Sequence, residues 1–199
     1  MEVSVVTLAT EDALSEAMGL RLIAESPFAG LHVHPQRKNG FGYLRRRMDG
    51  WCEMASWQVV LIITDLDTLS CPVKLLTDWA GIRMKLPERL LLRVAVREIE
   101  SWALADHEAM RKLIGKRGKL PLEPDLLPDP KQYLLRLAEQ APRNVRDDLV
   151  KKKGAVASQG VGYNARLTAW VKEAWSPARA AERSPSLARA RRALAQLGK

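Results

Sequence analysis

The chain has 199 residues, 47% of them hydrophobic, which suits one globular domain with a sizeable core, or one domain with an appended lobe. No run of about 18 apolar residues is present, so we expect no membrane-spanning helix. The first residues lack the basic segment of a signal peptide, and two cysteines make no disulfide framework, so we expect a cytoplasmic protein.

The net charge of +9 is concentrated in the second half of the chain. Residues 1–110 carry 12 Lys and Arg against 15 Asp and Glu, whereas residues 111–199 carry 20 against 8. A basic half of this kind is typical of proteins that contact nucleic acid. A solvated basic helical region without a partner has the same composition, so charge alone leaves both interpretations open.

Strand and helix patterns alternate from the start of the chain. Residues 3–9 form a short β-branched run, which predicts a strand. Thr10 is the expected N-cap of a helix over residues 11–25, where apolar side chains recur at helical spacing. Alternating side chains within residues 30–41 predict an edge strand.

The alternation continues to about the middle of the chain. A helix is expected over residues 43–57, and the dense apolar run of QVVLIITDLDTL, residues 58–69, is typical of a strand buried on both faces. Residues 71–81 predict a helix and residues 90–96 a strand, which passes without a break into a helical pattern over residues 97–106. This order predicts an α/β fold with a mostly parallel sheet and right-handed crossovers.

The rest of the chain has a different composition. Residues 116–130 are rich in Gly, Pro and charge, which indicates a loop or linker, and residues 147–162 combine a lysine run with a glycine-containing stretch. Helical patterns follow in residues 133–140, 165–174 and 187–197. We therefore expect an α/β domain over residues 1–115 and a basic, mainly helical region packed on it over residues 116–199.

Acidic residues follow three of the predicted strands. Asp65 and Asp67 end the buried strand, and residues i and i+2 of an extended chain point to the same side, so we expect their carboxylates to lie together. Glu11 follows the first strand, and Glu98 and Glu100 follow the last one. Since parallel strands place their carboxyl ends at the same edge of a sheet, all these acids should converge there.

Converging carboxylates repel one another, which is costly unless a cation is bound. Mg²⁺ and similar hard ions take oxygen ligands and are often held by one or two carboxylates together with substrate phosphates. The acids therefore predict a metal site. Each of them also has a structural interpretation, either as a turn residue or as an acid that complements the dipole of a following helix.

An acid after the first strand and a D-x-D motif after a later strand resemble the TOPRIM domain of topoisomerases, primases and OLD-family nucleases. Glu11, Asp65 and Asp67 carry this resemblance, and the segment EIESW resembles a further acidic motif of OLD-type proteins through Glu100. The resemblance to small bacterial TOPRIM-like proteins extends over most of the chain, through TEDALSEAMGLRLI, RKNGFGYLRRR, ITDLD, REIESWALAD and YNARLTAWVKEAWSPARAAERSPSLARA.

This resemblance implies a nuclease that hydrolyses phosphodiesters with Mg²⁺ or Mn²⁺. Asp65 and Asp67 would hold a metal ion, and Glu11 would share a metal or act as general base toward water. Glu100, with Glu98 as a lesser candidate, would complete a second metal position. The resemblance further implies DNA as the substrate, an ABC- or SMC-type ATPase as a protein partner, and a role in defence against phage or plasmids.

Two basic clusters are candidates for contacts with the phosphates of nucleic acid. One consists of Arg45, Arg46 and Arg47, and the other of Lys151, Lys152 and Lys153, which could also supply a lysine that stabilises the transition state. The competing interpretation is that both clusters belong to solvated faces.

Two other functions remain open on the sequence. The segment DLDTL also resembles the nucleophile loop of haloacid-dehalogenase-like phosphatases, but that family carries the motif on its first strand, whereas two strand–helix units precede it here. The chain could instead be a non-catalytic module that binds DNA or an ATPase, in which case the acids would be structural. Phosphatase assays and metal titration distinguish these alternatives from a nuclease.

Overall fold

The structure, a computed structural model, describes residues 4–37, 41–81 and 85–198. Val3 and residues 38–40, at the ends of two predicted strands, lie outside the described residues. No helix in the described part of the chain is long and apolar enough to cross a membrane.

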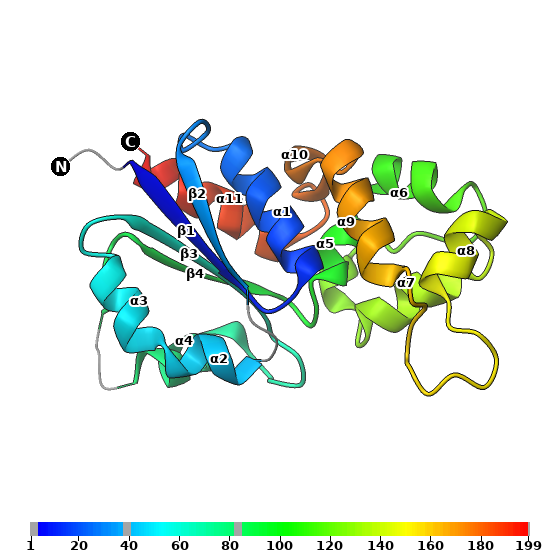
Figure 1. The fold of residues 1–199 in the computed structure, drawn as a ribbon, viewed down its shortest axis with the longest axis horizontal. Helices are drawn as coiled ribbons and strands as arrows, with labels where there is room; N and C mark the ends of the chain where they lie inside the picture. Colours follow the sequence, from blue (N-terminus) through cyan, green and yellow to red (C-terminus); the bar gives the residue numbers. More distant parts are fainter. Residues whose placement is uncertain (1–3, 38–40, 82–84, 199) are drawn as a thin grey trace.

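A four-stranded parallel sheet forms the centre of the first half of the chain (Figure 1). Its strands are β1 (Val5–Thr10), β2 (His32–Arg37), β3 (Val59–Asp65) and β4 (Leu90–Ala95). They are arranged in the order β2-β1-β3-β4, so β2 lies at one edge, as its alternating pattern predicts, and β4 lies at the other. The prediction of an α/β fold with a parallel sheet is confirmed.

Helices cover both faces of this sheet. α1 (Ala13–Ala24) and α11 (Pro185–Leu197) share a core with one face, while α2 (Phe41–Arg46), α3 (Met48–Met54) and α4 (Pro72–Ala80) pack on the other (Figure 1). This two-sided cover explains the composition of β3, in which every residue is buried except the last, Asp65.

The remaining helices lie beyond the carboxyl ends of the strands (Figure 1). They are α5 (Glu100–Ala105), α6 (His107–Ile114), a 3₁₀ helix (Pro124–Leu126), α7 (Pro130–Ala138), α8 (Arg143–Leu149), α9 (Tyr163–Glu173) and α10 (Pro177–Ala180). The apolar core of these helices is continuous with the core between the sheet and α1.

Buried tryptophans fix the position of these helices. The indole N–H of Trp102 in α5 donates to the Ser186 hydroxyl of α11 at 2.8 Å. Trp175 donates to the main-chain oxygen of Trp102 at 3.0 Å, and Trp170 to that of Ala109 at 2.9 Å. Each ring therefore buries a large apolar surface while its single polar group keeps a partner.

Several element boundaries differ from the sequence-based expectation. Asp12 caps α1 in place of Thr10, because its carboxylate accepts the N–H of Ser15 at 2.7 Å. The single helix predicted over residues 43–57 is two helices, α2 and α3, interrupted at Arg47. Strand 90–96 does not continue directly into a helix, because Arg97 has a φ of 65° and turns the chain. The short helices α8 and α10 were not predicted.

Candidate functional site

The carboxyl ends of β1, β3 and β4 are neighbours at one edge of the sheet. β3 lies between the other two strands, and its last residue, Asp65, is aligned with Ala95 at the end of β4. Glu11 directly follows β1, and Glu98 lies between β4 and α5, which begins with Glu100. The parallel topology therefore brings the predicted acids to one edge.

Main-chain hydrogen bonds continue the pairing of β3 and β4 beyond the strands. The N–H of Leu66 donates to the oxygen of Ala95 at 2.9 Å, and the N–H of Asp67 to that of Arg97 at 2.8 Å. The Arg97 guanidinium donates in return to the main-chain oxygens of Asp67 and Leu69, both at 3.0 Å. Arg97, which was not predicted as a site residue, thus ties the two acid-bearing loops together.

The expected extended backbone at Asp67 is wrong. Asp67 has a φ of 50°, in the left-handed region, so the alternation of an extended strand ends at Asp65. Asp65 is half-buried at the end of β3, whereas Asp67 is exposed on the following turn. The two carboxylates still affect each other, because Asp67 contributes to raising the pKa of Asp65.

Asp65 has the most unusual environment of these acids. Its Oδ1 atom is buried and has no hydrogen-bond partner. Burial raises the pKa of Asp65 well above its ordinary value, and the charges of Glu100, Asp12, Glu11 and Asp67 raise it further. A carboxylate oxygen is therefore held away from water, among like charges and without a donor.

Glu11 is anchored to the strand beside it. Its carboxylate accepts a hydrogen bond from the hydroxyl of Thr64, a buried residue that precedes Asp65 in β3. Burial raises the pKa of Glu11, the Thr64 hydrogen bond lowers it, and the charge of Asp67 raises it. Glu11 is thereby fixed in position and kept more basic than a surface glutamate.

Glu100 is a buried carboxyl with 4% of its surface exposed. It accepts a hydrogen bond from the Tyr163 hydroxyl at 2.7 Å. Burial raises the pKa of Glu100 to about 7, although the Tyr163 bond and the charge of Lys131 act in the opposite direction. The same surroundings raise the pKa of Tyr163, first through burial and then through Glu100, so Tyr163 remains a hydrogen-bond donor.

Lys131 lies close to Glu98 and Glu100. Its main-chain N–H donates to the Glu98 carboxylate at 2.9 Å, and its ammonium group lies 5.2 Å from the centre of the Tyr163 ring. Its charge lowers the pKa of both Glu98 and Glu100, although burial leaves both raised. The sequence offered no signal for this role, because residue 131 adjoins a segment predicted as a linker.

The acids do not form a ready-made metal cage. Among the described residues, no three Asp, Glu, His or Cys side chains are grouped closely enough to hold an ion together. The donor set still fits Mg²⁺ or Mn²⁺, because such ions keep several water ligands and need only one or two carboxylates. The buried, unpartnered Oδ1 of Asp65 is a suitable first ligand, and Asp67 is exposed to solvent.

The two predicted basic clusters have different positions. Arg45 lines a hollow of about 350 Å³ together with Asp67, Thr68 and Trp79, so this arginine lies next to the acidic edge. Arg46 is exposed. Arg47 donates to the Tyr43 hydroxyl at 2.8 Å and lies 4.6 Å from the centre of the Trp51 ring, so it is partly engaged in packing.

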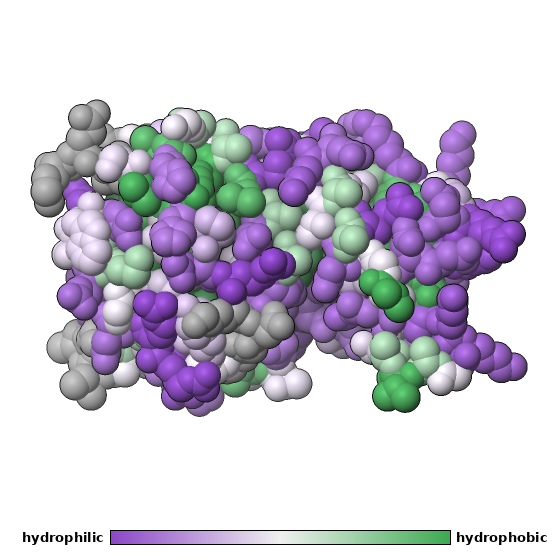
Figure 2. Space-filling view, in the orientation of Figure 1, coloured by the Kyte–Doolittle hydropathy of each residue, from purple (hydrophilic) through white to green (hydrophobic). Residues whose placement is uncertain are grey.

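The lysine cluster lies on an exposed loop between α8 and α9, which projects from the body of the molecule (Figure 1). No hydrogen bond or ion pair joins Lys151, Lys152 or Lys153 to the acids in the part of the chain that the structure describes. Hydrophilic side chains also cover most of the face formed by the C-terminal helices (Figure 2). Lys131, in contrast to this lysine cluster, lies beside Glu98 and Glu100.

Comparison of the chain with protein-family models, with curated proteins and with solved structures gives no match.

Proposed function

We propose that this chain is a Mg²⁺- or Mn²⁺-dependent nuclease of TOPRIM type, which hydrolyses phosphodiester bonds at the acidic edge of its sheet. DNA is the proposed substrate, in agreement with the basic second half of the chain. An ABC- or SMC-type ATPase is the proposed protein partner and defence against phage or plasmids the proposed role, both on the resemblance of the sequence motifs.

The observation that carries the proposal is the state of Asp65. A buried carboxylate oxygen without a donor is costly, and the neighbouring carboxylates increase that cost. A divalent cation would satisfy this oxygen and offset the repulsion at once. A purely structural aspartate at this position would instead be expected to accept hydrogen bonds from nearby main-chain N–H groups, as Asp12 does.

Each residue of the site has a proposed part in the reaction. Asp65 and Asp67 would hold the metal ion, which when bound would supply positive charge to polarise the phosphate. Glu11, fixed by Thr64, accepts a proton from the attacking water. Glu100 is the proposed ligand of a second metal position, and the hydrogen bond from the Tyr163 hydroxyl orients its carboxylate.

Lys131 and Arg45 supply positive charge around this edge. The ammonium group of Lys131 lies near Glu98 and Glu100 and can stabilise negative charge on the transferring phosphate. Arg45 borders the hollow beside Asp67 and can contact a neighbouring phosphate of the same strand.

Cleavage of supercoiled plasmid in the presence of Mn²⁺ tests the proposal. The intact protein should nick the plasmid, and Asp65→Asn should reduce the rate by roughly 100-fold or more, because it removes a charged ligand without changing the size of the side chain. Asp147→Asn, a matched change at an exposed position of α8, should have no effect.

Three results would contradict the nuclease assignment. Cleavage that persists in Asp65→Asn would place the chemistry elsewhere or in a contaminant. Turnover of p-nitrophenyl phosphate without cleavage of DNA would favour the phosphatase alternative. Absence of both activities together with absence of metal binding would favour the non-catalytic module.

A further inference from the structure

β4 forms one edge of the sheet. Within the described residues β4 pairs with β3 alone, and the main-chain oxygens of Arg89 and Ala95 accept hydrogen bonds from Val60 in β3 and from Leu66 directly after it. Because main-chain groups alternate in direction along a strand, those of Leu92 and Val94 point away from β3. Unpaired groups of this kind are a template for the addition of another strand.

A groove runs along this edge between two helices. It has a volume of about 320 Å³, near the lower limit of the roughly 300–1,000 Å³ range of ligand pockets. Val73 and Leu76 of α4 form one wall and Arg189 of α11 belongs to the other, while residues 92–94 of β4 form the floor. Val73 is 66% exposed, so the apolar wall is accessible from solvent.

The lining of the groove is positively charged. Arg93 and Arg189 both line it, and none of its lining residues, all of which the structure describes, is acidic. The Nε atom of Arg93 is buried and has no hydrogen-bond partner. Burial also lowers the pKa of Arg93, so its charge is poorly solvated. An anionic group in the groove would accept a hydrogen bond from this Nε atom and would offset the poorly solvated charge of Arg93.

We propose that this groove binds an extended, acidic peptide segment of another protein, which adds to β4 as a fifth strand. Its main chain pairs with that of Leu92 and Val94, an acidic side chain meets Arg93 and Arg189, and an apolar side chain packs on Val73 and Leu76. The charge of the groove disfavours a second copy of this chain, because a β4–β4 pairing would bring the arginines of two copies together. This proposal does not depend on nuclease activity.

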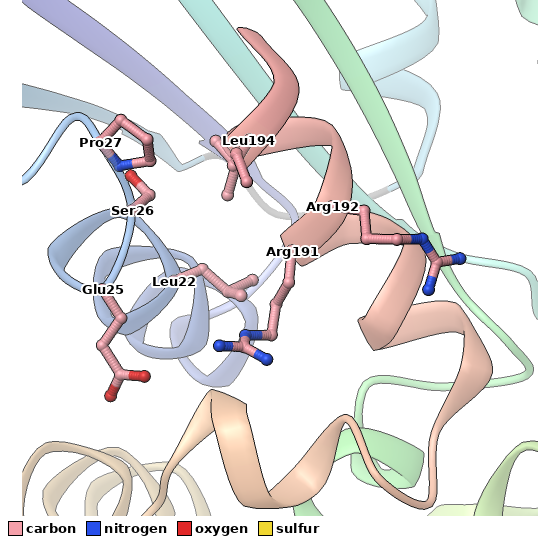
Figure 3. A pocket seen from close by; sticks show the side chains of 8 residues that line it. Leu22, Glu25, Ser26, Pro27, Arg191, Arg192 and Leu194 are labelled. Carbon is pink, nitrogen blue, oxygen red and sulfur yellow. The ribbon is translucent and has the colours of Figure 1, made fainter. Parts of the chain in front are cut away.

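The opposite side of α11 provides a matched control. There, a cavity of about 190 Å³ lies between α1 and α11, and Arg191 points into it beside Leu22 and Glu25 (Figure 3). Arg192 also borders this cavity (Figure 3). Arg189→Gln and Arg191→Gln therefore remove the same charge from the same helix, but only the first change affects the groove.

Selection from random seven-residue peptides displayed on phage tests the proposal, with the intact protein as bait. The enriched peptides should alternate acidic and apolar residues. A synthetic copy should bind at least about tenfold more weakly to Arg189→Gln, and equally well to Arg191→Gln. Proline at the centre of the peptide should abolish binding, because it removes a main-chain donor. Binding should slow hydrogen exchange at the amides of Leu92 and Val94.

Several results would overturn this assignment. Failure to enrich acidic peptides would do so, as would equal losses in both arginine variants, which would indicate unspecific charge attraction. Retained binding of the proline peptide would exclude strand addition. A dimer in light scattering that Arg189→Gln dissociates would assign the groove to a second copy of the chain.

Discussion

At the scale of single residues, Glu100 couples the site to the stability of the fold. Its pKa is raised from an ordinary 4.5 to about 7, so the folded protein holds a proton that the unfolded chain releases. The associated stability is fully present below pH 4.5 and is lost as the pH rises toward 7. This difference between the pKa of Glu100 in the folded and in the unfolded protein corresponds to about 3 kcal/mol of unfolding free energy.

Glu100→Gln is therefore expected to stabilise the metal-free protein at pH 8, by up to about 3 kcal/mol, because the amide can still accept the Tyr163 hydrogen bond but carries no charge. Urea denaturation between pH 5 and pH 8, with a chelator present, measures the effect. The stability of the variant should also fall less steeply with pH than that of the unsubstituted protein. A parallel pH dependence in the two proteins would show that Glu100 is not the group responsible.

Lys131 provides a second test at this scale. Lys131→Met keeps the main-chain bond to Glu98 but removes the ammonium group, so nuclease activity should fall roughly 100-fold while Mn²⁺ binding persists. The acidic limb of the pH–rate profile should shift to higher pH, because the positive charge that lowers the pKa of Glu100 is lost. Lys172→Met, at an exposed position of α9, is the control. Equal activity in both variants would show that the ammonium group of Lys131 has no role in the reaction.

At the scale of elements, the sequence predicts the strands and acids better than their surroundings. The apolar run of β3 and the acids after β1, β3 and β4 are local features, and parallel pairing is sufficient to bring those acids to one edge. The bond between Tyr163 and Glu100 joins residues 63 apart, and that between Lys131 and Glu98 joins residues 33 apart. Such contacts depend on how the C-terminal helices pack, which no local pattern reveals.

The same limit applies to the turn after β3. An alternating pattern predicts that Asp65 and Asp67 point to one side, whereas the left-handed φ of Asp67 depends on the neighbouring strand. The bonds that support this turn come from Ala95 and Arg97, which belong to β4 and its following loop. The D-x-D motif thus predicts where these acids lie along the chain, but not the geometry of the turn that carries Asp67.

Gly160, in the loop between α8 and α9, lies very close to the main chain of Asp148. A side chain at Gly160 would place its Cβ 2.2 Å from the main-chain oxygen of Asp148, so the loop can close only on glycine. Gly160→Ala should destabilise the protein by about 1–3 kcal/mol. Gly50→Ala, in α3 with no atom within 4 Å of the added Cβ, should instead be neutral or stabilising by up to about 1 kcal/mol. Urea denaturation measures the free energy of unfolding of both variants. An equal change in the two variants would contradict the close approach at Gly160.

At the scale of the whole molecule, the candidate site belongs to both halves of the chain. The sheet supplies Glu11, Asp65 and Asp67, while helices α7 and α9 supply Lys131 and Tyr163. One continuous apolar core connects α1 with these helices. The basic second half is therefore part of the structure that holds the acids, in addition to its proposed attraction for nucleic acid.

This organisation predicts that residues 1–115 do not fold alone. Removal of residues 116–199 would expose the apolar face of α1 and leave the Trp102 indole without its Ser186 partner. The fragment should therefore lack a cooperative urea transition, which the complete chain should show. Circular dichroism during urea titration measures the unfolding transition of the fragment and that of the complete chain. A cooperative transition in the fragment would mean that the first half is an independent domain.

The central claim is that the acidic edge binds a divalent metal ion through Asp65. Calorimetric titration of the metal-free protein with Mn²⁺ tests it without any assumption about the substrate. The unsubstituted protein and Asp147→Asn should bind Mn²⁺ with the same affinity, while Asp65→Asn should bind it at least about tenfold more weakly, because the buried Oδ1 loses its charge. Equal Mn²⁺ binding in all three proteins, or binding in none of them, would contradict the claim.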